Sequence, residues 1–474
     1  MGLGTHDNDS TLTIFIIDHK FVAMKTVIHI LFDADSWVGR ISCAILYALF
    51  YDFMYKNVVY YFFSYMTGLD YEEMSIPSFI LWLIISILPM AFHHRIEKVT
   101  TFICLFMYLF IYIPFVHGLF TSYGISNTML YSYCGVLCML FVVYFCIGKY
   151  HIALKDIDFK PSIPFVYIEW CALLITILFI AVRGSSMHFV NIFTQLDILY
   201  ELREENAAGI GSMGFIVYLQ GSLFGAFYPF LLICYLNQKA YSKTALVLLG
   251  YFLLFMVDMQ KITFLMPFAL IGLYYLIKVK EKSICERLHS YIIIGISVLS
   301  FLLYFLQENG NELLFTLLAI LLLRTVCVAG WLTQMYYHFF QENPYTYYSH
   351  INVINAITNA YPYDRPLGRA VAYGTQNANA NMFLTDGMAA AGLPGILIIG
   401  IVFLMVLLTI NSISYKYKNT DLFVIILPAL SFLLNISLFT AFLSEGLILL
   451  LLLLLCTDSP VVIKEVEESQ QEII

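Results

Sequence analysis

Long apolar segments recur along almost the whole chain, and they limit the folds that it can adopt. About thirteen of them reach or approach the roughly 17 to 25 residues that an α-helix needs to cross a bilayer. They lie near 41–63, 76–92, 99–117, 129–148, 164–182, 213–235, 244–258, 262–277, 290–306, 313–330, 388–411, 421–440 and 442–456. Because 61% of the residues are hydrophobic and only 12% are charged, a water-soluble domain of this size would expose large apolar patches. The sequence therefore predicts an all-α, polytopic integral membrane protein with about 12–14 transmembrane helices.

The order of these segments divides the chain into five expected regions. They are a cytoplasmic N-terminal arm (1–40), a transmembrane helical bundle (41–330), a large outer loop (331–387), C-terminal transmembrane helices (388–457) and an acidic cytoplasmic tail (458–474). Apolar residues at helical spacing also predict an outer interfacial helix near 186–206.

Basic loops set the expected orientation, because short cytoplasmic loops collect Lys and Arg. The loops concerned are 93–98, 148–160, 237–243, 278–287 and 415–418. Alternation holds through residue 287 and places 183–212 on the outer face. Beyond residue 287 the alternation of inner and outer loops is one crossing out of step with the basic loop at 415–418. We therefore expect 313–340 to be re-entrant, to lie along the outer interface or to cross twice, next to a wet cavity.

Five basic side chains lie in or beside lipid on the expected outer side. They are Arg183, Lys261, Arg324, Arg365 and Arg369. An arginine at the centre of a bilayer costs about 2.5 to 3.5 kcal/mol on insertion scales, so such a cation needs a partner. Snorkelling alone can explain Arg183, and pairing with Asp258 can explain Lys261. Together, several cations with few carboxylates predict an anionic ligand such as a phosphate.

The expected outer loop is rich in aromatic rings and amides. Its candidate ligand-binding residues include Tyr336, Tyr337, Asn377 and Asn381. Tyrosine suits sugar binding and equally suits an interfacial belt, whereas a belt does not need so many amides. Asp386 precedes a new apolar run and is either the cap of a helix or a functional carboxylate.

Several other kinds of site lack their motifs in this sequence. There is no HExxH, no P-loop and no GxSxG, and the ten cysteines are scattered singly. The sequence therefore predicts no metal site and no cofactor, and its acidic ends give no indication of nucleic-acid binding.

Four stretches resemble the bacterial O-antigen polymerases of the Wzy type, also called oligosaccharide repeat unit polymerases. They are VRGSS at 182–186, VDMQKITFLMP at 257–267, LLRTVCVAGWLTQMYYHFF at 322–340 and NANMFLTDGMAAAGLPG at 379–395. The resemblance implies a GT-C-like fold in the bacterial inner membrane with a periplasmic outer loop. It also implies metal-independent transfer of a glycan from undecaprenyl diphosphate onto another lipid-linked repeat unit. The implied partners are undecaprenyl-diphosphate-linked oligosaccharides as donor and acceptor, membrane lipids, and a chain-length regulator as a further candidate.

This chemistry needs positive charge at the departing diphosphate and a base for the attacking hydroxyl. The five basic residues are candidates for the first task, and Asp386, His350 and Asp364 are candidates for the second. An O-antigen ligase remains an alternative, because ligases carry a histidine in the outer loop and His350 fits that pattern. A lipid-linked oligosaccharide flippase is a third hypothesis, although the sequence lacks the internal repeats expected of a transporter.

Overall fold

The computed structural model describes residues 36–94, 96, 98–154, 163–190, 198, 202, 215–310 and 312–458. The expected N-terminal arm, the interfacial helix near 186–206 and the acidic tail therefore lie almost wholly outside the described residues. The described part is helical apart from its loops and one pair of two-residue parallel strands, β1 (Ile163–Pro164) and β2 (Thr457–Asp458).

The N-terminal third forms one compact group of helices. It contains α2 (Trp37–Met54), η1 (Tyr55–Tyr60), α3 (Tyr61–Phe63), α4 (Ile76–Ile87), η2 (Leu88–Phe92), α5 (Val99–Met107), η3 (Tyr108–Tyr112), α6 (Ile113–Phe120) and α7 (Asn127–Tyr150), where η marks short 3-10 or π segments. Serines begin several of these helices. Ser36, Ser75 and Ser126 each accept a hydrogen bond from a backbone N–H in the first helical turn, which otherwise lacks a partner.

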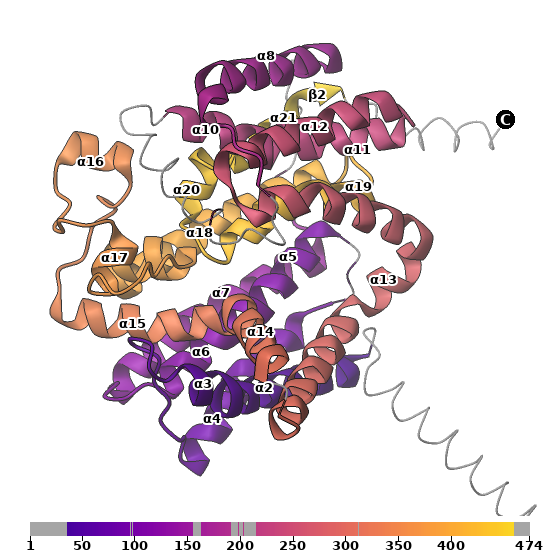
Figure 1. Cartoon of the computed structure of the whole chain (residues 1–474). Coiled ribbons are helices and arrows are strands. Elements are labelled where there is room, and N and C mark those ends of the chain that lie inside the picture. Colours follow the sequence, from indigo (N-terminus) through magenta and orange to yellow (C-terminus); the bar gives the residue numbers. More distant parts are fainter. Residues whose placement is uncertain are drawn as a thin grey trace, which may run out of the picture.

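The middle of the chain forms a second group. It contains α8 (Phe165–Arg183), η4 (Gly184–Ser186), α10 (Phe215–Ser222), η5 (Leu223–Phe227), α11 (Tyr228–Asn237), α12 (Tyr241–Asp258) and α13 (Lys261–Glu308). Helix α13 leaves this group and curves back to the first one (Figure 1). Sequence analysis predicted a loop at 278–287 between two spans, and the structure corrects this, because the helix continues through it. Its Lys, Glu and Arg residues are good helix formers, and it contains neither Gly nor Pro.

The C-terminal part contributes to both groups. It contains α14 (Glu312–Leu322), η6 (Leu323–Cys327), α15 (Val328–Glu342), α16 (Asn352–Thr358), α17 (Leu367–Val371), η7 (Phe383–Met388), α18 (Ala389–Ile413), α19 (Asn419–Leu433), α20 (Leu438–Leu443) and α21 (Leu447–Cys456). In Figure 1, α16 and α17 protrude at one end of the bundle. The predicted domain boundary at 330/331 falls inside α15, so the first part of the expected loop is helical.

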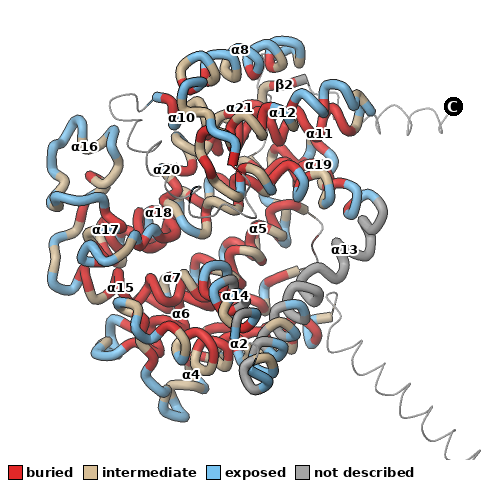
Figure 2. The backbone as a smooth tube through the Cα atoms, viewed as in Figure 1, coloured by how far each residue is buried: buried red, intermediate tan, exposed pale blue. Residues whose placement is uncertain are grey.

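Helix α15 is buried because it packs closely on α6. A Cβ atom added at Gly118 would lie 2.3 Å from the carbonyl oxygen of Gly330, so the two backbones nearly touch. In the same group, His117 is fully buried and contacts Asp52 at 2.8 Å, with the rings of Tyr51 and Tyr55 against it. In Figure 2, α6 is mostly buried, whereas α8 is mostly exposed.

Eight helices in the described part are long and apolar enough to cross a membrane. They are Trp37–Phe63, Val99–Phe120, Asn127–Tyr150, Phe165–Ser186, Phe215–Asn237, Tyr241–Asp258, Lys261–Lys278 and Phe383–Ile413. Ile76–Phe92, Asn419–Leu433 and Leu447–Cys456 are apolar but shorter. The structure thus has the helical architecture expected of a polytopic membrane protein. Eight is below the predicted 12–14 partly because the last two expected spans are interrupted between 434 and 446.

Candidate functional site

A sharp break in the chain organises the candidate site. Between η7 and the rest of α18, Ala391 and Gly392 leave the helical conformation, and Gly392 has φ +63°, which glycine adopts without strain. The chain turns back there so closely that a Cβ atom at Gly395 would lie 2.1 Å from the Gly387 carbonyl oxygen. The glycines of the stretch 379–395 do not by themselves predict this break.

The loop before α16 is fastened to this break by its backbone. The N–H groups of Thr346 and Tyr347 donate to the carbonyl groups of Ala389 and Ala390 at 2.8 and 2.9 Å. Tyr347 and Tyr348 have φ of +47° and +66°, an uncommon conformation for non-glycine residues. Backbone strain of this kind is often found at functional sites.

This fastening brings two predicted candidates together. The Nε2 atom of His350 lies 3.2 Å from the Oδ1 atom of Asp386, and the Nδ1 atom of His350 lies 2.8 Å from the Thr346 hydroxyl. The His350 side chain is 6% exposed and that of Asp386 is fully buried. Two residues 36 positions apart in the sequence therefore form one oriented histidine–carboxylate pair.

The Asp386 carboxylate also caps the start of helix α20, which belongs to another segment of the chain. Its Oδ1 atom accepts a hydrogen bond from the Ser437 hydroxyl, and its Oδ2 atom accepts one from the Leu438 N–H, both at 2.6 Å. The sequence predicts either a cap or a functional carboxylate at this position. The structure shows a cap for a different helix, and the same carboxylate holds His350.

The other predicted residues of the outer loop lie in different environments. Asp364 is exposed and lies 3.7 Å from Arg365, so it is not part of the buried pair. Arg365, Arg369 and Asn377 are exposed, whereas Asn381, Tyr336 and Tyr337 are buried. Tyr336 donates to the carbonyl of Ala378 at 3.0 Å, and the ring of Tyr337 contacts that of Tyr133 edge-on. Asn381 accepts a hydrogen bond from the Phe383 N–H at the start of η7.

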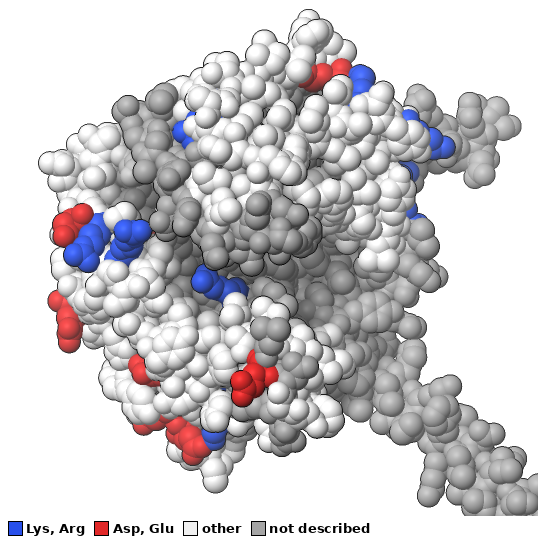
Figure 3. All heavy atoms as spheres, in the orientation of Figure 1, with Lys and Arg blue, Asp and Glu red and all other residues white. Residues whose placement is uncertain are grey.

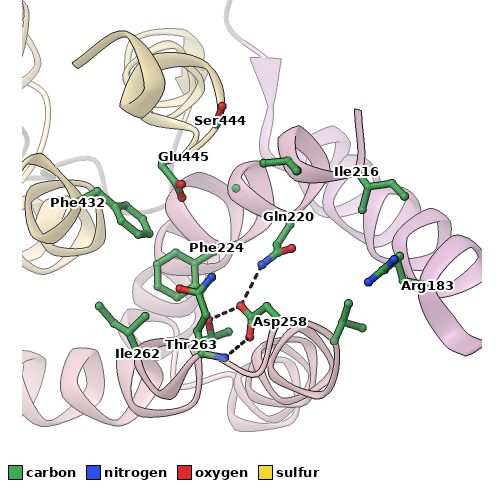
Figure 4. Close-up of a pocket in the computed structure, with 14 residues that line it drawn as sticks. Arg183, Ile216, Gln220, Phe224, Asp258, Ile262, Thr263, Phe432, Ser444 and Glu445 are labelled. Atoms are coloured by element: carbon green, nitrogen blue, oxygen red, sulfur yellow. Dashed lines mark hydrogen bonds between the residues drawn. The ribbon is translucent and has the colours of Figure 1, made fainter. Parts of the chain in front are cut away.

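Arg183 lies in a separate polar cavity of about 250 Å³. Figure 4 shows Arg183 entering from α8 and Glu445 from the turn between α20 and α21, with Asp258 and Gln220 between them. Asp258 accepts hydrogen bonds from Gln220 at 3.0 Å and from Thr263 at 2.5 Å. The cavity therefore presents one guanidinium and two carboxyl groups, together with amide and hydroxyl groups.

The five basic residues do not form one shared cluster in the described part of the chain. Lys261 begins α13 beside the cavity-lining Gln260 and Ile262 but does not line the cavity, and Arg324 is exposed on η6. On the face in Figure 3, basic side chains form separate small groups, some of them next to acidic ones. Of the five, Arg183 lines the described cavity, and the shared binding of an anion by these residues stays a prediction.

Glu445 was missed by sequence analysis, although a signal was present. The stretch FLSEGLILL places a carboxyl group and a glycine within an apolar run, which is typical of a broken helix at a functional position. Glu445 lies in the turn outside the eight candidate spans, and burial raises its pKa to about 7. Sequence analysis also did not identify Thr346 and Ser437, whose roles depend on long-range contacts.

The Glu445→Gln variant is expected to be more thermostable than the natural protein at pH 8 and similar to it at pH 4.5. The unfolded chain releases the Glu445 proton near its ordinary pKa, whereas the fold keeps that proton until about pH 7. Stability from this group is therefore full at low pH and is lost as the pH rises to about 7, at a cost of at most about 3 kcal/mol. Melting temperatures in detergent at both pH values measure this difference. A constant difference between the two proteins would contradict it.

No group of three or more His, Cys, Asp and Glu residues within the described ranges is arranged to hold a metal ion. Comparisons of the chain with protein-family models, with curated proteins and with solved structures found no match.

Proposed function

We propose that this protein is a glycosyltransferase that polymerises undecaprenyl-diphosphate-linked oligosaccharide repeat units into O-antigen or a related surface polysaccharide. The reaction takes place on the periplasmic side of the bacterial inner membrane, within a GT-C-like helical fold. The observation that carries the proposal is the oriented, buried pair of His350 and Asp386. The apolar helical architecture adds support, because a lipid-linked substrate needs a membrane enzyme.

In this proposal His350 is the general base and Asp386 is its positioning residue. Neutral His350 donates its Nε2 proton to Asp386, which leaves a lone pair on Nδ1, an assignment that follows from the hydrogen-bond pattern. At rest the Thr346 hydroxyl donates to Nδ1, and the Ala389 carbonyl lies 3.1 Å from that hydroxyl as an alternative acceptor. Thr346 can therefore release Nδ1 without losing its own hydrogen bond.

The reaction then follows from this free lone pair. A hydroxyl of the acceptor sugar takes the place of the Thr346 hydroxyl, transfers its proton to Nδ1 and attacks the anomeric carbon of the donor. The new carbon–oxygen bond forms as the bond to the lipid diphosphate breaks, and the diphosphate leaves as an anion. Arg365 and Arg369, exposed in the same outer loop, are the candidates to neutralise this developing charge.

An O-antigen ligase is the second candidate function. It would use the same donor and deliver the glycan to lipid A core. The orientation of His350 favours this alternative as much as it favours polymerisation, because the base acts on a hydroxyl in both cases. The two reactions differ in which intermediate accumulates when the enzyme is inactive.

The test is the surface polysaccharide of a strain whose own copy is deleted and replaced by a His350→Ala variant. We expect long polymer to fall by roughly 10² to 10⁴-fold, as when a general base is lost, while protein in the membrane stays at the natural level. Surface glycan limited to single repeat units indicates a polymerase, and polymer held on undecaprenyl diphosphate indicates a ligase.

The matched control is His338→Ala, because His338 is another partly buried histidine, hydrogen-bonded to Ser122 at 2.8 Å. This variant should keep its polymer. Full-length glycan from His350→Ala at normal protein levels would show that the histidine is not the base.

A further inference from the structure

An apolar groove of about 450 Å³ runs along the outside of helix α8, between that helix and α12. Leu173, Ile177 and Ile180 line it from α8, and Leu246 and Leu249 line it from α12. Several of these side chains are exposed, Leu246 by 67%. Helix α8 is apolar yet contributes few residues to the core, so the groove opens toward the expected lipid.

The two helices run side by side in the same direction and are tied together at both ends. Near their starts, Lys243 lies 2.7 Å from Glu169. Just beyond the end of α8, the N–H of His188 donates to the carbonyl of Met256 in α12 at 2.9 Å. From Glu169 to Arg183 the helix rises about 21 Å, a large part of the hydrocarbon thickness of a bilayer.

The groove ends about one helical turn before the polar cavity, since Ile180 and Leu253 line the groove and Arg183 and Val257 line the cavity. Arg183 ends α8 and Asp258 ends α12, and both line that cavity (Figure 4). Inside, Gln220, Glu445 and Thr263 offer hydrogen-bonding groups, and phenylalanine rings offer an apolar face. The Asp258 carboxylate, joined by Glu445 where that group is ionised, disfavours a diphosphate deep in the cavity, whereas sugar hydroxyls can hydrogen-bond to the carboxyl, amide and hydroxyl groups there.

The cavity also lies close to the His350–Asp386 pair. The first residue of helix α20, Leu438, donates its N–H to Asp386. Ser444, which directly follows the last residue of this helix, lines the cavity. The helix has only six residues, so the two places are separated by roughly 10 Å along its axis. An extended saccharide can cover that distance.

We propose that the groove and the cavity together bind one amphiphilic substrate, a polyprenyl-diphosphate-linked saccharide. The prenyl chain lies between α8 and α12, the diphosphate lies beside Arg183, and the first sugar enters the polar cavity. This inference rests on the proposed function, because it assigns the place of the lipid-linked acceptor of that reaction, whereas Arg365 and Arg369 stay the candidates for the diphosphate of the donor. It gives Arg183 the task of binding the diphosphate and gives Asp258 and Glu445 the task of binding sugar.

The test uses the full-length protein in detergent micelles and radiolabelled undecaprenyl diphosphate as the probe. Leu173→Trp narrows the groove and should weaken binding at least about tenfold, equivalent to the loss of about two buried methylene groups. Leu174→Trp is the matched control, because Leu174 is the next residue on α8, is 64% exposed and does not line the groove. It should bind within about twofold of the natural protein. Equal affinity of the two variants would overturn the groove assignment.

Two further measurements test the headgroup and the specificity. Arg183→Gln should weaken binding of undecaprenyl diphosphate but not of undecaprenol, and an equal effect on both would overturn the role of Arg183. An excess of dioleoyl phospholipid should not displace the probe. Displacement of the probe by this excess would show a general lipid groove and overturn the assignment.

These outcomes are separate from the fate of the proposed reaction. Binding needs no turnover, so His350→Ala should bind the probe with the natural affinity. If binding depends on Leu173 while His350→Ala still makes polymer, the groove stands and the proposed base fails. If polymer is lost as expected but Leu173→Trp binds normally, the reaction stands and the groove fails.

Discussion

A Gly221→Ala variant is expected to lose a large part of the stability of the protein. Gly221 lies on α10 directly against the turn between α20 and α21, and an added Cβ atom would lie 1.6 Å from the Ser444 carbonyl oxygen. Gly225, one turn later, faces the Glu445 carbonyl oxygen at 1.9 Å in the same way. Since backbone and not a flexible side chain is in contact, the helix or the turn has to move. We expect a loss of about 3 kcal/mol or more.

Thermal unfolding of the purified protein in detergent measures this loss. The matched control is Gly135→Ala on α7, where no heavy atom lies within 4 Å of the added Cβ. Alanine is a better helix former than glycine, so this control should be unchanged or more stable by up to about 1 kcal/mol. Melting temperatures that shift alike in the two variants would mean that α10 and the turn do not touch as described.

The close contact at Gly221 also connects stability with the site. It fixes Ser444 and Glu445 on one side of the polar cavity, and the same turn ends α20, whose first residue is held by Asp386. A shift of this turn therefore displaces the cavity and the support of His350 together. For this reason the Gly221→Ala variant should lose lipid binding and polymer even in the fraction that stays folded.

The helices could be predicted from the sequence because their information is local. A run such as Phe165–Arg183 is apolar along its whole length, and the serines at positions such as Ser126 mark where helices begin. His350 and Asp386 were identified as candidates because their residue types suit proton transfer. Their mutual contact was not predicted, since it depends on the break at Gly392 and on a loop fastened to the far side of it.

The surroundings of the basic residues could not be predicted for a related reason. Sequence analysis counted cations near one face but could not see which carboxyl groups the fold brings beside each of them. Asp258 and Glu445 come from segments almost 190 residues apart and meet around the cavity that Arg183 lines. Likewise, the basic residues at 278–287 indicated a loop between two spans. The structure instead has one continuous helix, α13, through this stretch.

An Asp386→Asn variant is expected to keep the fold and lose polymer formation. With its amide oxygen toward Leu438, the substituted side chain still accepts the Leu438 N–H, and the Ser437 hydroxyl can turn to accept from the amide group. His350 then has to accept at Nε2 and carry its proton on Nδ1, which Thr346 can accept. The histidine keeps its place but has the wrong tautomer, so it cannot take a proton from a sugar hydroxyl. We expect a stability loss of about 1 to 2 kcal/mol and an activity loss of up to roughly 10⁴-fold.

Melting temperature and polymer yield, measured on the same variant, separate these two effects. Asp52→Asn is the matched control, because the partly buried Asp52 holds the fully buried His117 in another histidine–carboxylate pair, within the first helix group. It should show a comparable loss of stability with polymer formation preserved. If polymer yield in Asp386→Asn falls only as far as it does in Asp52→Asn, then Asp386 acts as a helix cap alone. If the polymer yield falls much further in Asp386→Asn than in Asp52→Asn, the Asp386 carboxylate controls the tautomer of His350.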